Sequence, residues 1–396
     1  MQSFEASLAK ATKKDSNGLA GAVAAVVDKT GKFLYQHVQG TNGVSAGAAP
    51  LQFDQTYFLA SATKLIASIA ALQCVERGLI KLDDPLDKHI PEFTSQKIIT
   101  PTEDGGFELH DATKPVTLRH LLTHSSGAAY TQFIPSLMAW RESQGQSPFE
   151  MSRDVAKKYP EPRLFEAGEG WMYGSSTDWA GLLVSRLTSQ SLGDYVEANI
   201  ASPLNITSFT WQPERKPAVA DKLMRISVRQ PDGSLVDMTE PLVPVFETEN
   251  GGAGMHANVE DYTRVLVDLI SDTPVLLKPE TIELLFTPQF ADGGPEQTAM
   301  IPIGAMTWGA HTGRRTEGIT PNYALGGYIV THDVEREDYL IRKGTLRWSG
   351  MLNLHWGANK ERGVGYMFAT QILPWNDDVS QDLAAEFETA VWRTFG

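Results

Sequence analysis

Segments with the pattern of β-strands lie near both ends of this 396-residue chain, and helical segments fill its middle. Residues 21–40 predict two strands around a turn at 28–31. After about residue 300, several strand-length apolar segments alternate with glycine-containing turns, and a helical segment at 380–395 follows. A single sheet that takes strands from both ends of the chain explains this order most simply.

The length of the chain indicates more than one domain, because a single hydrophobic core rarely grows to 396 residues. We expect an α/β domain built from residues 1–80 and 250–396. A mostly helical domain is expected as an insertion at 81–249, where helical segments include one at 116–127 that Thr117 should cap.

The bulk charge argues against two classes of partner. The net charge is −14, whereas nucleic-acid and anionic-membrane surfaces need clustered Lys and Arg. No apolar run approaches the length of about 20 residues that spans a bilayer. The first residues lack the apolar core of a signal peptide, and Cys74, the only cysteine, falls in an apolar run. We expect a cytoplasmic protein with no nucleic-acid or membrane partner.

A serine and a lysine stand three residues apart in LASATKLIASI, residues 59–69. If a helix runs from about residue 62 to Gly78, Ser61 and Lys64 share one face of it and their side chains can hydrogen-bond. Serine is a weak nucleophile that needs a neighbouring base, and lysine serves when apolar surroundings favour its neutral form. The alternative is a helix-capping Ser61 followed by a solvated Lys64.

Two later segments favour the chemical interpretation. Tyr173 lies on a tight turn just before a helix, where a phenol can pass a proton between nucleophile and leaving group. Residues 347–356 predict a strand with a break of small residues at Ser349 and Gly350, after which the strand continues. A glycine in a strand often marks close backbone approach, so the N–H groups of Met351 and Ser61 could form an oxyanion hole.

In this order and at these separations, Ser-x-x-Lys, Tyr-x-Ser and the glycine-containing strand resemble the class C β-lactamase and penicillin-binding-protein superfamily. Within it, family VIII carboxylesterases are the closer relatives. TLRHLLTHSSG and PLNIT are also typical of the superfamily, and the match runs from about residue 20 to residue 395. The segments LASATK, ALQCVERGL, WMYGSSTDWAG, RKGTLRWSG and LPWND most resemble fungal lovastatin-type acyltransferases (simvastatin synthases) and statin esterases.

The resemblance implies a transpeptidase-like fold, in which helices flank an antiparallel sheet and a mostly helical domain is inserted. It implies that Ser61 is the nucleophile, Lys64 its base and Tyr173 the second acid or base, with Met351 in the oxyanion hole. It also implies five substrate-binding residues, Tyr130, Ser175, Trp348, Gly350 and Trp375. Two of these depart from β-lactamases, which carry Lys at Trp348 and Asn at Ser175; both departures favour an ordinary ester.

We therefore predict a serine carboxylesterase that works through an acyl-enzyme. Its substrate would be a hydrophobic small molecule with an ester side chain, of the statin or polyketide type, such as lovastatin. The alternative is acyl transfer from a thioester or ester to a polyketide alcohol, with an acyl-carrier protein as donor. A β-lactamase and a non-catalytic binding protein are less favoured. No metal and no organic cofactor are expected.

Three other motifs compete with this interpretation. GVSAG at 43–47 matches a nucleophile elbow, but no helix follows it. HTG at 311–313 imitates the third motif, but too many strands follow it, so we favour 348–350. His120 and His124 have the spacing of zinc ligands on a helix, but no third ligand is evident. We expect these two histidines to hold the Tyr130 loop through polar contacts.

Overall fold

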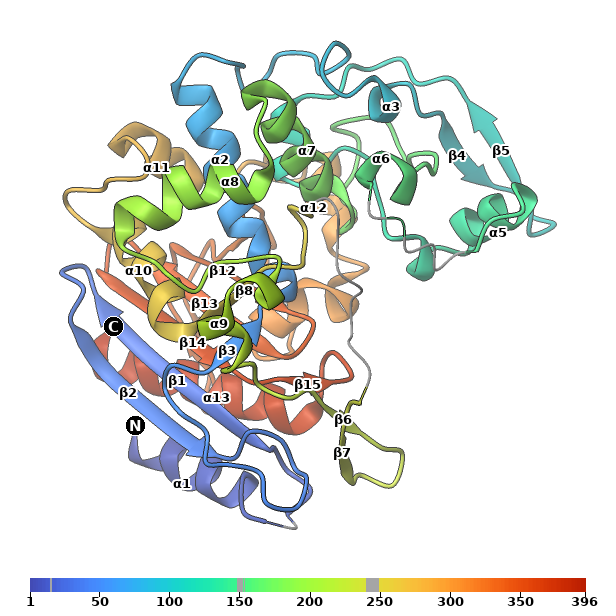
Figure 1. Ribbon diagram of the computed structural model, residues 1–396. Helices are drawn as coiled ribbons and strands as arrows, with labels where there is room; N and C mark the ends of the chain where they lie inside the picture. Colours follow the sequence, from blue (N-terminus) through green and yellow to red (C-terminus); the bar gives the residue numbers. More distant parts are fainter. Residues whose placement is uncertain (15, 148–151, 153, 240–248) are drawn as a thin grey trace.

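A six-stranded antiparallel sheet forms the centre of the structure (Figure 1). The computed structural model describes residues 1–14, 16–147, 152, 154–239 and 249–396. The strand order is β2-β1-β14-β13-β12-β9, so the first hairpin joins the last strands through the pair β1 and β14. The strands are β1 (Gly21–Asp28), β2 (Phe33–Gly40), β9 (Tyr328–Ile329), β12 (Thr345–Gly350), β13 (Leu354–Asn359) and β14 (Val364–Ala369). The expectation of one sheet from both chain ends is confirmed.

Helices cover both faces of this sheet. Helix α10 (Val259–Ile270) packs on β1, β13 and β14, while α1 (Gln2–Ala11) and α13 (Asp378–Phe395) pack together on the opposite face (Figure 1). All but the last residue of β1 are buried, which explains its unbroken run of alanine and valine.

Helix α2 (Thr63–Glu76) runs through the core, and residues 63–74 are all buried. Gly78 ends it with a φ of +71°, and the Leu79 N–H donates to the Cys74 carbonyl at 3.0 Å, as in a Schellman motif. The predicted helix and its glycine stop are therefore confirmed. Helix α7 (Ser176–Thr188) packs alongside α2.

Besides α7, the described residues in the middle of the chain, between α2 and the strand β8 (His256–Asn258), form short helices and two hairpins. Its helical elements are α3 (Pro91–Thr94), α4 (Leu118–Leu122), η2 (Thr131–Phe133), α5 (Pro135–Ser143), α6 (Val155–Lys158), α8 (Leu192–Val196), η3 (Glu197–Ala201), η4 (Ser202–Leu204), η5 (Pro213–Arg215) and α9 (Pro217–Ala220). Its strands are β4 (Ile98–Pro101), β5 (Phe107–His110), β6 (Ser227–Arg229) and β7 (Leu235–Asp237).

The remaining elements flank the sheet. They are β3 (Thr56–Phe58), η1 (Ala60–Ala62), β8 (His256–Asn258), α11 (Pro279–Leu285), α12 (Pro295–Met300), η6 (Gly304–Met306), η7 (Trp308–His311), β10 (Val334–Glu335), β11 (Leu340–Ile341) and β15 (Ile372–Leu373). Strand β6, from the middle of the chain, pairs with the late strand β15. The division into two domains stays a prediction, and 81–249 includes residues outside the described ranges.

One sequence expectation is wrong in detail. The strand at 347–356 does not continue through its small-residue break, because β12 ends at Gly350 and the chain reverses into β13. Asn353, with a φ of +60°, supplies the left-handed position of this turn. The expected cap is confirmed, because Thr117 caps the short helix α4, which ends at Leu122 before the left-handed His124 with a φ of +59°. None of the described helices is long and apolar enough to cross a bilayer.

Candidate active site

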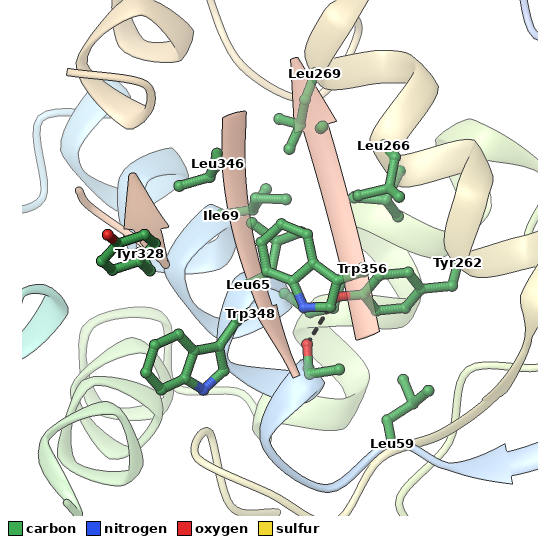
Figure 2. Close-up of a cluster of buried hydrophobic side chains, with 14 of the residues drawn as sticks. Leu59, Leu65, Ile69, Tyr262, Leu266, Leu269, Tyr328, Leu346, Trp348 and Trp356 are labelled. Atoms are coloured by element: carbon green, nitrogen blue, oxygen red, sulfur yellow. Dashed lines mark hydrogen bonds between the residues drawn. The ribbon is translucent and has the colours of Figure 1, made fainter. Parts of the chain in front are cut away.

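Ser61 lies in a tight turn that joins β3 to α2. Ala60, just before it, has a φ of +46°, a strained conformation for a residue with a side chain. The capping position of α2 is Ala62, so Ser61 does not cap the helix, and the alternative of a helix-capping serine is wrong. From α10, the Tyr262 hydroxyl donates to the Ala62 carbonyl at 3.0 Å and fixes the turn against the core (Figure 2).

Lys64 is 2% exposed, and its Nζ atom is surrounded by three oxygen atoms. It lies 3.3 Å from the Ser61 hydroxyl, 3.1 Å from the Tyr130 hydroxyl and 2.7 Å from the Gly252 carbonyl. Nζ donates to the Gly252 carbonyl and to the Tyr130 hydroxyl, and these two contacts hold it against the Ser61 hydroxyl. The alternative in which Lys64 is solvated is therefore excluded.

Two phenols stand beside this amine. Tyr130 contacts Lys64 directly, whereas the Tyr173 ring faces the Lys64 Nζ with 4.8 Å to the ring centroid. The Tyr173 oxygen accepts a hydrogen bond from the Trp348 indole at 3.3 Å, and no hydrogen bond among the described residues joins it to Ser61. Burial, and then the nearby Asp178 carboxylate, raise the pKa of the Tyr130 phenol well above its usual range, so this phenol is protonated at neutral pH.

The end of β12 lies against the Ser61 turn. A Cβ atom at Gly350 would overlap the Leu59 carbonyl oxygen, so only glycine allows this close backbone approach. Met351 follows directly, where the oxyanion role of its N–H stays a prediction. Figure 2 shows the Trp348 ring on one side of the start of α2 and Leu59 on the other.

A cavity of about 420 Å³ opens over Ser61. Its wall is largely aromatic and apolar, and it includes four of the five predicted substrate-binding residues, Tyr130, Trp348, Gly350 and Trp375. The fifth, Ser175, is 2% exposed and does not line the cavity, so its substrate contact stays a prediction. Tyr173 and Met351 line the same cavity.

A buried carboxylate behind the site escaped the sequence analysis. Asp178 is 1% exposed and accepts a hydrogen bond from the Gly252 N–H at 3.3 Å, while the Gly252 carbonyl accepts one from Lys64. Burial raises the pKa of the Asp178 carboxyl. In the sequence, Asp178 could be recognised as a charged residue at the start of the otherwise apolar helical segment DWAGLLV.

An ion pair in the wall of the cavity was also missed. Arg141 is 2% exposed and donates to the Glu161 carboxylate at 2.5 Å, and Thr131 donates to the same oxygen. Because Thr131 follows Tyr130 directly, this ion pair holds the segment that places the Tyr130 phenol against Lys64.

The competing motifs lie elsewhere. Ser45 of GVSAG is exposed and donates to Asp237. His311 of HTG is buried in η7, with its Nε2 atom 3.4 Å from the Ser349 hydroxyl. His120 completes the cap of α4, and His124 accepts from the Gly174 N–H at 3.4 Å, so it holds the Tyr173 turn rather than the Tyr130 loop. The described residues contain no cluster of three or more potential metal ligands.

The chain is similar to known proteins over nearly its whole length. A family model described as β-lactamase matches residues 6–391. The chain is 35% identical to acyltransferase calJ of Penicillium decumbens, over 100% of this chain and 99% of the relative. It is 33% identical to the lovastatin esterase of Penicillium rubens, over 96% of each chain. The solved structure of unliganded simvastatin synthase (LovD) from Aspergillus terreus matches with a TM-score of 0.88 and 30% identity, over 100% of this chain and 98% of that chain. Relatives of nearly equal similarity thus include acyltransferases and an esterase.

Proposed function

The chain belongs to the β-lactamase family, and we propose that it is a serine esterase that forms an acyl-enzyme on Ser61. Its fold is that of β-lactamases and penicillin-binding proteins, as the sequence predicts. The observation that carries the proposal is the buried Lys64 amine, 3.3 Å from the Ser61 hydroxyl at the base of an apolar cavity.

The first half of the reaction uses the groups around Lys64. The amine accepts the Ser61 proton while the serine oxygen attacks the ester carbonyl, and the N–H groups of Ser61 and Met351 receive the negative charge. The tetrahedral intermediate then expels the alcohol. Tyr173 protonates it, since its phenol lines the cavity and the Trp348 indole N–H can stabilise the resulting phenolate. Tyr130 orients Lys64 through the 3.1 Å contact.

The second half transfers the acyl group to water, with Tyr173 as base. A second candidate is acyl transfer to an alcohol, which the similarity to acyltransferase calJ and simvastatin synthase favours. The substrate we propose is a hydrophobic ester of the statin side-chain type, on the basis of the same relatives and the lovastatin esterase. A cytoplasmic location fits the single, buried Cys74 thiol.

A β-lactam is a poorer substrate in this proposal. The third motif offers the indole of Trp348 where β-lactamases present a lysine, so a β-lactam carboxylate loses that cation. Lys158 lines the cavity, but it comes from α6 and not from β12. Slow turnover of nitrocefin compared with p-nitrophenyl butanoate is therefore expected.

Turnover of p-nitrophenyl butanoate tests the proposal. Ser61→Ala should abolish it. Equal rates in variant and wild type would contradict the esterase proposal and favour a non-catalytic binding protein. Tyr173→Phe should lower kcat by about 100-fold or more, and Tyr130→Phe by about tenfold. The reverse order would make Tyr130 the acid. Release of free acid from lovastatin, without ester formation when an acyl thioester and the deacylated alcohol are supplied, decides for hydrolysis over transfer.

A further inference from the structure

Three exposed apolar side chains surround the mouth of the cavity. Phe133, Met306 and Met351 are 71%, 73% and 42% exposed, and all three also line the cavity. Phe133 and Met306 are the two most exposed large apolar side chains among the described residues. We name these three residues the apolar collar. Large apolar side chains gathered at one place on a surface usually mark a binding site.

The apolar collar is assembled from separate parts of the chain. Phe133 comes from η2, Met306 from η6 and Met351 from the turn after β12. Phe133 lies three residues after Tyr130, and Met351 lies three residues after Trp348. A molecule that reaches the reaction centre can therefore touch the apolar collar at the same time.

The size of the cavity indicates which part of an ester would reach the apolar collar. At about 420 Å³ it lies near the small end of the range of roughly 300 to 1,000 Å³ for ligand sites. The carbonyl must sit beside Ser61, so an acyl group and the ester link occupy much of this space. A bulky alcohol would then extend to the mouth, where unbranched methionine side chains adapt to irregular apolar shapes.

A protein partner explains the apolar collar less well. A specific protein interface takes roughly 20 to 30 residues from each side. The apolar collar offers three apolar residues, which suit one face of a small molecule. Its continuity with the cavity also favours an occupant that enters the reaction centre.

We propose that the apolar collar binds the alcohol portion of the substrate and makes Phe133 and Met306 determinants of specificity for esters of bulky, apolar alcohols. This inference rests on the proposed esterase function and specifies which residues select the substrate. Loss of one collar side chain should weaken the transition state for a bulky ester more than for a small one, because only the bulky alcohol touches the mouth.

Two butanoate esters with the same acyl group test this. Ethyl butanoate carries a small alcohol, and decahydro-1-naphthyl butanoate carries a bulky apolar one. For each protein, the ratio of the two kcat/KM values, bulky over small, is measured. Phe133→Ser and Met306→Gln should each lower this ratio about tenfold, the lower range for one missing hydrophobic contact. Val275→Ser is the matched control, since Val275 is 64% exposed and does not line the cavity.

The outcomes separate this inference from the proposed function. A ratio equal to that of wild type in both collar variants overturns the inference, as does an equal fall in the Val275→Ser control. So does sedimentation that shows a wild-type dimer and monomeric collar variants, because the collar would then join two copies. If Ser61→Ala loses turnover but the collar variants keep the wild-type ratio, the proposed esterase function stands and only the role of the apolar collar is contradicted. Thermal unfolding of each variant verifies that it folds.

Discussion

Replacing Gly350 with alanine should slow the enzyme about 100-fold without unfolding it. The added methyl would lie about 1 Å inside van der Waals distance of the Leu59 carbonyl oxygen. That oxygen belongs to the backbone just before Ser61, so it cannot rotate away as a side chain would. The end of β12 must move, and with it the N–H of Met351.

The expected magnitude follows from this displacement. A shift of about 1 Å in a catalytic group costs about 100-fold in rate, and loss of one oxyanion donor costs about 100- to 1,000-fold. Because the oxyanion forms only in the transition state, kcat should fall while KM changes little. The assay is p-nitrophenyl butanoate turnover, with the burst of p-nitrophenolate recorded to follow acylation.

Gly365→Ala is the matched control. Gly365 lies in β14 of the same sheet, where an added methyl would meet the side chains of Leu266 and Val27 at 3.2 Å. β14 is separated from β12 by β13, so kcat should stay at the wild-type value even if the melting temperature falls. A folded Gly350→Ala variant with kcat within about threefold of wild type would refute the placement of the oxyanion donor at the end of β12.

Three further predictions concern groups around the site. Trp348→Phe removes the 3.3 Å hydrogen bond to Tyr173 and should lower kcat about fivefold for p-nitrophenyl butanoate. Burial lowers the pKa of His355 to about 3, so this residue is neutral when folded but protonates near pH 6.5 when unfolded. Stability is then lost as pH falls from about 6.5 toward 3, by up to about 1.4 kcal/mol per pH unit for this one residue. His355→Phe should remove this share of the slope in urea unfolding between pH 7 and 4.5, while the other buried histidines with lowered pKa values keep theirs. Arg141→Met leaves the Glu161 charge buried and unpaired and should cost about 3 kcal/mol of unfolding free energy, part of which Glu161→Gln should restore in the double variant.

Each of these has a contradicting result. An unchanged kcat in Trp348→Phe would show that the indole N–H does not assist the phenol. An acid slope in His355→Phe as steep as that of the wild type would show that His355 does not contribute to the loss of stability. A double variant no more stable than Arg141→Met would mean that the unpaired charge is not what destabilises the single variant.

The sequence was sufficient for features that depend on local spacing. Three-residue spacing on a helix places Ser61 and Lys64 together. The glycine at position 350, which lacks a side chain, indicates the close backbone contact. Asp178 could have been found as well, because a charged residue in an apolar helical segment needs a buried partner.

Other features depend on tertiary packing and leave no local pattern. Nothing around Tyr130 indicates that its phenol contacts Lys64, which is 66 positions earlier in the chain. The reversal after Gly350 was missed because MLN resembles the continuation of a strand. Only the left-handed Asn353 reveals the turn, and asparagine adopts that conformation too rarely to predict it from one residue.

The pairing of β1 with β14 affects how the protein is made. Val23 pairs with Ala369, so one edge of the first hairpin has no neighbour until nearly the whole chain has left the ribosome. At about 5 to 20 residues per second, this interval lasts roughly 20 to 70 seconds. An apolar strand with a free edge recruits other chains during that time. Truncation before β14 would make the exposure permanent, and such chains should accumulate as aggregates unless a chaperone shields the nascent hairpin.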